Sequence, residues 1–64
     1  MSANASHELA ANRLMARLSG FIQGIGMSGP DARRIVDRVS EEMPHAGDGD
    51  REATARAWML IALA

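Results

Sequence analysis

The chain has 64 residues, no cysteine and a formal net charge of −1 at pH 7. This length provides a single domain, and at about 60 residues folding buries only roughly 60% of the surface that the unfolded chain exposes. Disulfides and thiolate metal sites are excluded, so oligomerisation or a larger partner is the expected source of extra stability. The charge balance does not resemble that of a strongly basic nucleic-acid coat protein.

All seven basic side chains are arginine, and alanine is abundant. Both residues favour helices. Arginine without any lysine, together with abundant alanine, suggests a GC-rich bacterial genome. The polar, uncharged segment 1–6 lacks the basic and apolar regions of a signal peptide. The longest apolar run, 57–64, is shorter than the about 20 residues that a membrane span requires. We therefore expect a cytoplasmic protein without a membrane span.

The first helix is predicted over about residues 7–24, after a frayed or disordered segment 1–6. Ser6 is placed to act as its N-cap. Gly20 and Gly24 lie one turn apart, which indicates either close packing against another backbone or early fraying. Apolar residues recur at helical spacing on one face, which is formed by Ala11, Leu14, Met15, Leu18, Phe21, Ile22 and Ile25.

A second helix is predicted over about residues 30–43. Its start is marked either by Gly29 as N-cap with Pro30 in the first helical position, or by Ser28 as N-cap. Pro44 ends the helix because proline cannot continue it. The apolar stripe of this helix consists of Ala32, Ile35, Val36, Val39 and Met43. Charged residues cover the rest of its surface, so we expect one buried face.

The third helix is predicted over about residues 50–63, with Asp50 as its cap. Its first half mixes charged residues with alanine, whereas 57–64 is apolar on every side. A helix that is apolar all round is normally buried all round. The first two helices each provide one apolar stripe, which covers one side of this segment. We therefore predict an all-α fold for residues 7–64, a small three-helix bundle completed by oligomerisation or by a partner.

No residue pattern indicates catalysis, a cofactor or a metal site. His7 and His45 lie far apart in polar surroundings, so we expect their side chains to be solvated. The acidic segment 48–52 is not followed by the glycine and final glutamate of a calcium-binding EF-hand loop. The glycine-rich segment 20–29 lacks the lysine and the preceding strand of a phosphate loop. We expect a non-enzymatic protein with no cofactor, no metal ion and no small-molecule substrate.

The order of the first two helices and the turn 26–29 also resembles a helix-turn-helix, the motif of many DNA-binding regulators. In that alternative, Arg33, Arg34 and Arg38 would face DNA. However, residues 28–43 carry three arginines against four acidic side chains. DNA affinity depends heavily on phosphate neutralisation, so nucleic-acid binding is the second hypothesis.

The main hypothesis is a protein–protein interaction module that uses the apolar C-terminal helix. It would self-associate as a homo-oligomer, or dock onto a larger protein as an adaptor or regulator. Tryptophan and methionine are enriched at interfaces, and methionine adapts to irregular surfaces. The predicted contact residues are Trp58, Met59, Leu60, Ile61 and Leu63, with Met15, Phe21 and Ile22 from the first helix. A closed monomeric core is the other interpretation of the same residues.

Overall fold

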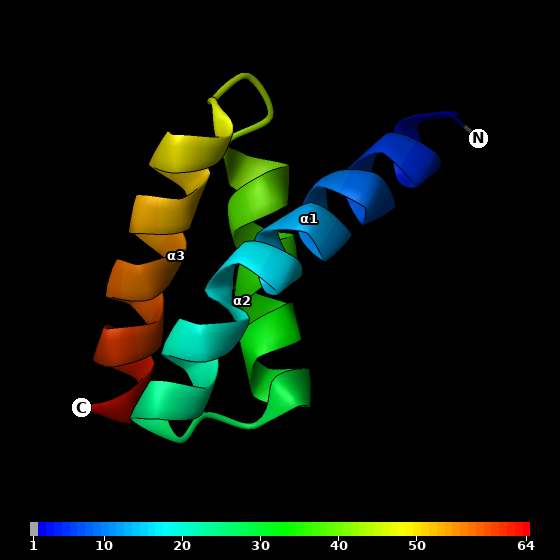
Figure 1. Ribbon diagram of the computed structural model, residues 1–64. Coiled ribbons are helices and arrows are strands. Elements are labelled where there is room, and N and C mark those ends of the chain that lie inside the picture. The colour runs from blue at the N-terminus through cyan, green and yellow to red at the C-terminus, as the bar shows by residue number, and fades with distance from the viewer. Residues whose placement is uncertain (1) are drawn as a thin grey trace.

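The computed structural model describes the backbone of residues 2–64 and the side chains of residues 8–64. Within this part of the chain the helices are α1 (Ser2–Ile25), α2 (Gly29–Glu42) and α3 (Asp48–Leu63). Because α2 runs antiparallel to both α1 and α3, the C-terminal end of α3 lies beside the turn between α1 and α2 (Figure 1). The predicted all-α, three-helix fold is confirmed for the described residues.

α1 is the longest of these helices, and it begins at Ser2, five residues before the predicted start at His7. Ser6 therefore lies inside the helix and is not its N-cap. Two alanines in the first turn account for the earlier start, because alanine is the strongest helix former. The N-terminal turns of α1 project past α2 and α3 (Figure 1). The His7 side chain, which was expected to be solvated, lies outside the described part of the chain, as does Met1.

α1 ends in a tight turn that leads directly into α2. Gly26 has a φ of 74°, a left-handed backbone conformation that other residues rarely adopt. Ser28 then caps α2, because its Oγ accepts a hydrogen bond of 3.3 Å from the backbone N–H of Asp31. Of the two predicted starts, the one with serine as N-cap is confirmed. α2 ends at Glu42, just before the proline that was expected to stop it.

α3 begins at Asp48, two residues earlier than predicted, with a glycine as its N-cap. Asp50 therefore lies within the first turn, where its charge still favours the positive end of the helix dipole. Arg51 ties this end of α3 to the preceding loop. Its guanidinium donates hydrogen bonds to the backbone oxygens of Met43 (2.9 Å) and Pro44 (2.8 Å). These bonds add to the one that the Met43 carbonyl accepts from the backbone N–H of Ala46 (3.3 Å).

The core lies where one face of each described helix meets the other two. Its largest fully buried side chains are Leu14, Leu18, Val36, Val39 and Met59. Partly buried side chains surround them, namely Met15, Phe21, Ile25, Ile35, Met43 and Trp58. The apolar stripes predicted for the first two helices are therefore confirmed.

The two glycines inside α1, Gly20 and Gly24, face outward. A methyl group added at either position would meet no described atom within 4 Å beyond its own turn of helix. Close packing against another described backbone is therefore wrong as an explanation. Early fraying does not explain them either, because α1 continues through both glycines to Ile25.

Candidate protein interface

The C-terminal half of α3 keeps large apolar side chains in contact with solvent. Leu60, Ile61 and Leu63 are 52%, 71% and 50% exposed. Met59, beside them, is fully buried and anchors the helix on the core. The one other large apolar side chain this exposed among the described residues is Leu9, near the far end of α1. Three of these four side chains therefore gather within about one turn of α3.

The register between α1 and α3 explains why this end is uncovered. Three side-chain contacts across the pair each join a residue of α1 to the residue 35 positions later in α3. The contacts are Arg13–Asp48 (3.4 Å), Arg17–Glu52 (2.6 Å) and Arg56 over the ring of Phe21 (5.8 Å to its centroid). In this parallel register, Ile25 at the end of α1 corresponds to Leu60. The residues after Leu60 therefore extend past α1, which cannot cover them.

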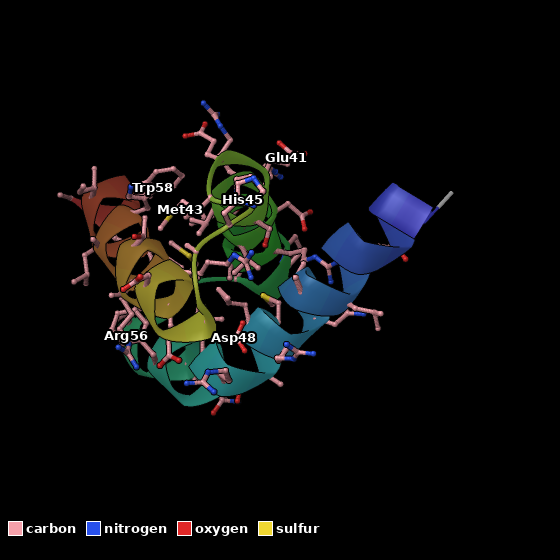
Figure 2. All side chains as sticks on the ribbon, turned by 90° about the horizontal axis from the view of Figure 1, so that it is seen from above. Glu41, Met43, His45, Asp48, Arg56 and Trp58 are labelled. Carbon is pink, nitrogen blue, oxygen red and sulfur yellow. The ribbon has the colours of Figure 1, made fainter. Side chains whose placement is uncertain are left out.

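On its other side, α3 forms an apolar groove with α2. The groove has a volume of about 520 Å³, and its lining consists of Ile35, Arg34 and Arg38 from α2, and Trp58, Ile61 and Ala62 from α3. A smaller hollow of about 220 Å³ shares part of this lining and extends it to Met27, Asp31 and Leu63. Trp58 lies on the α2 side of α3 and Arg56 on the α1 side (Figure 2). One side of α3 is therefore an apolar groove, and the other is occupied by ion pairs.

Two of the eight contact residues predicted from sequence lie in the core. Met59 is fully buried and Ile22 is 6% exposed, so neither is available to a partner. Both belong to the helix faces that meet in the bundle. In the all-apolar segment 57–64, helical periodicity does not distinguish the inner face from the outer one. We therefore leave these two residues out of the candidate interface.

The remaining predicted residues do not form one surface. Trp58 and Ile61 line the α2–α3 groove together. Phe21 lies on the opposite side of α3, beneath the guanidinium of Arg56. Met15 is half-buried against the core and is not part of the groove lining. The candidate interface is thus the exposed end of α3 together with the groove, and it does not include these α1 residues.

The groove also contains residues that the sequence pattern did not assign to a protein partner. Ile35 was expected in the buried stripe of α2, and it lies at the edge of that stripe, half-buried. Arg34 and Arg38 were expected to face DNA, and they form the α2 edge of the groove. The sequence signal for this edge is the adjacent pair Ile35 and Val36. Neighbouring residues of a helix point in different directions, so when Val36 faces the core, Ile35 lies at its edge.

Each of the three α2 arginines has an acidic partner on its own helix. The pairs are Arg33–Asp37 (2.9 Å), Arg34–Asp31 (3.5 Å) and Arg38–Glu42 (2.9 Å). Arg33 also donates a hydrogen bond of 2.7 Å to the side-chain oxygen of Asn12 on α1. The three guanidinium groups therefore lie on two different sides of α2, one toward α1 and two along the groove.

The α1 side of α3 is held by a small charged network. Glu52 pairs with Arg17 at 2.6 Å and also with Arg56. The hydrogen bond that the Glu52 carboxylate accepts from Arg17 lowers the pKa of Glu52 below its ordinary value of 4.5, against the opposing effect of partial burial. This network fastens α3 to α1.

Comparisons with protein-family models, with curated proteins and with solved structures found no match to this chain. The candidate interface therefore rests on residue geometry.

No cluster of three or more acidic or histidine side chains that could hold a metal ion occurs within the described residues. Of the helices in this part of the chain, none is both long enough and apolar enough to cross a membrane.

Proposed function

We propose that this chain is a non-enzymatic helical interaction module, an adaptor or regulator that contacts another protein chain through the end of α3. The observation that carries the proposal is the cluster Leu60, Ile61 and Leu63, each at least 50% exposed, beside an apolar groove that contains Trp58. Contiguous exposed apolar surface of this kind marks protein interaction sites. Tryptophan is also among the side chains that contribute most binding energy at interfaces.

The size of the molecule determines how large such a contact must be. A stable interface buries about 800 Å² from each partner, which is about a fifth of the 4119 Å² exposed by the described chain. One turn of helix cannot provide that area. The contact therefore includes the α2–α3 groove as well as the exposed end of α3.

Self-association is tested by sedimentation equilibrium over a range of protein concentrations. If the partner is a second copy, wild-type protein should associate and Ile61→Asp should remain monomeric, because the new carboxylate would be desolvated in the contact. Leu9→Asp is the matched control: Leu9 is a 65% exposed aliphatic residue near the other end of α1, and its replacement should leave association unchanged.

Docking onto a different protein is tested by site-specific photo-crosslinking in cells that express the chain naturally. A photoreactive side chain at position 61 should give one adduct of defined mass, and the same group at position 9 should not. A protein that stays monomeric at every concentration and gives equal adducts at both positions would overturn the proposal.

The DNA-binding hypothesis stays a prediction with less support. Arg33 faces α1, away from Arg34 and Arg38, and all three guanidinium groups are paired. The DNA-binding hypothesis predicts that Arg33→Ala and Arg34→Ala remove binding to duplex DNA at low salt, which fluorescence anisotropy measures.

A cytoplasmic location and a bacterial source are also parts of the proposed function. Cell fractionation tests the location, and genomic assignment tests the source.

A further inference from the structure

We propose that the α2–α3 groove binds an amphipathic helix with an acidic edge, provided by a different protein. The proposal rests on the interaction function above and names the chemistry of the partner. Two features of the groove carry it: an apolar floor of helical dimensions, and two exposed arginines, each paired with an acid of α2, along one edge only.

The shape of the groove fits a helix. Its floor and apolar wall are Ile35, Trp58, Ile61 and Ala62, and α2 and α3 run antiparallel on either side. With its extension toward Met27, the lining on α2 covers residues 31–38. Eight residues correspond to about 12 Å along a helix axis, or roughly two turns. A partner helix laid in this space places apolar side chains at i, i+3, i+4 and i+7 against the floor.

The charge on the two edges differs. Arg34 and Arg38 are four residues apart, so they lie one above the other on the same edge of α2. Their side chains are 79% and 69% exposed. The facing part of α3, residues 57–63, contains no charged side chain. A complementary helix therefore carries acidic residues one turn apart on the flank facing α2 and neutral residues on the flank facing α3.

The acidic partners that the two arginines already have do not prevent this contact. Asp31 and Glu42 lie on the same exposed surface, and surface ion pairs of this kind contribute only about 0–1 kcal/mol. Each guanidinium has five N–H donors. Arg34 and Arg38 can therefore each bind a second carboxylate without losing the first.

A second copy of this chain does not provide such a helix in its described residues. The only acidic residue in α1 is Glu8. The apolar stripe of α2 is buried in its own core. In α3 the acidic residues lie within 48–52, whereas the exposed large apolar side chains lie within 60–63. In α1, Glu8 lies beside the exposed Leu9, but no second acid follows one turn later. No described helix therefore presents two acids one turn apart beside free apolar residues, so the occupant comes from another protein.

The test uses two synthetic amphipathic peptides of about five helical turns, or 18 residues. Both carry leucine at every i, i+3, i+4 and i+7 position of one face. One carries glutamate one turn apart on one flank of that face, and the other carries lysine at the same positions. Trp58 is the only tryptophan of the chain and lines the groove, so its fluorescence reports binding directly.

We expect the glutamate peptide to shift Trp58 emission to shorter wavelength and to bind wild-type protein about tenfold more tightly than the lysine peptide, as two exposed charge pairs would produce. The double variant Arg34→Glu/Arg38→Glu should reverse that preference. Arg33→Gln, on the α1 side of α2, should leave it unchanged. Thermal unfolding of each variant confirms that the fold is intact.

Three outcomes would overturn the inference. Equal binding of the two peptides would show that the partner helix needs no acidic edge. If Ile61→Asp then abolished the binding of both peptides, the proposed interaction function would still stand. Binding of neither peptide at millimolar concentration would remove the groove as a helix site. A Trp58 shift that depends on protein concentration in the absence of peptide would show that a second copy occupies the groove. Monomeric protein without position-specific crosslinks is the separate result that would overturn the proposed function.

Discussion

Ser40 buries a hydroxyl group for which the described residues provide no hydrogen-bond partner. The residue is 4% exposed, and its Oγ makes no hydrogen bond within the described part of the chain. A buried hydroxyl that loses its hydrogen bonds to water and gains no others costs about 1–3 kcal/mol. In a domain this small, that cost is a sizeable fraction of the free energy of unfolding.

Replacing Ser40 with alanine should therefore stabilise the fold. Ser19→Ala is the matched control, since Ser19 is also helical but exposed, with its Oγ donating to the Ala16 carbonyl. Both changes gain helix propensity, so only the difference between them reports the buried hydroxyl. We expect Ser40→Ala to exceed the control by about 1 kcal/mol in urea unfolding. Equal effects would mean that the hydroxyl is satisfied in solution.

At the scale of the element, the glycines around the end of α1 play opposite roles. Gly20 is exposed inside the helix with open space around it, so its flexibility in the unfolded chain only costs stability. Gly26 has a φ of 74°, which an L-amino acid with a side chain adopts at a cost.

We expect Gly20→Ala to raise the free energy of unfolding by about 1 kcal/mol. Gly26→Ala should lower it by roughly 1–2 kcal/mol, because alanine is strained in the left-handed region. Urea unfolding followed by circular dichroism measures both. If Gly20→Ala destabilised the protein, α1 would pack against something at that face in solution.

The contact between α1 and α3 predicts a pH dependence of stability. Because the ion pair with Arg17 lowers the folded-state pKa of Glu52, this pair stabilises the fold above about pH 4.5. Its contribution is lost as the pH falls through the lowered folded-state pKa, where the carboxylate becomes protonated in the native protein as well.

Glu52→Gln should therefore flatten the stability profile on its acidic side. Between neutral pH and about pH 3, we expect wild-type protein to lose more stability than this variant, as measured by urea midpoints. Glu41→Gln is the control, because Glu41 is exposed and makes no ion pair with the described residues. Parallel profiles for Glu52→Gln and wild type would show that the pair does not stabilise the fold.

At the scale of the whole molecule, few side chains make up the core. A chain of this length has a free energy of unfolding of about 3–10 kcal/mol. Replacing a buried leucine by alanine costs about 2–5 kcal/mol. Leu18 is fully buried in the C-terminal half of α1, so a single substitution there removes much of the total.

We expect Leu18→Ala to be partly unfolded at 25 °C without denaturant, with a reduced helical signal in circular dichroism. Leu9→Ala changes an exposed leucine of the same helix, and it should alter stability by less than about 0.5 kcal/mol. A cooperative, fully folded Leu18→Ala protein would contradict the small-core description.

The ends of the helices could be predicted where a side chain or proline determines them, and less well elsewhere. Ser28 and Pro44 mark the limits of α2 because each acts through local chemistry. The starts of α1 and α3 lie earlier than predicted, at Ser2 and Asp48. The N-cap of α3 is a glycine without a side-chain hydrogen bond, so no side chain marks that start in the sequence.

Helical periodicity was sufficient to identify the buried faces of α1 and α2, since each has apolar residues on one face and polar residues on the other. The segment 57–64 has no such contrast, and its inner and outer faces depend on the neighbouring helices. Met59 is buried because it meets the core, whereas Ile61 faces the open groove between α2 and α3 and stays 71% exposed. The sequence therefore determines that this segment requires a covering surface. The lengths and register of the packed helices determine which of its residues remain uncovered.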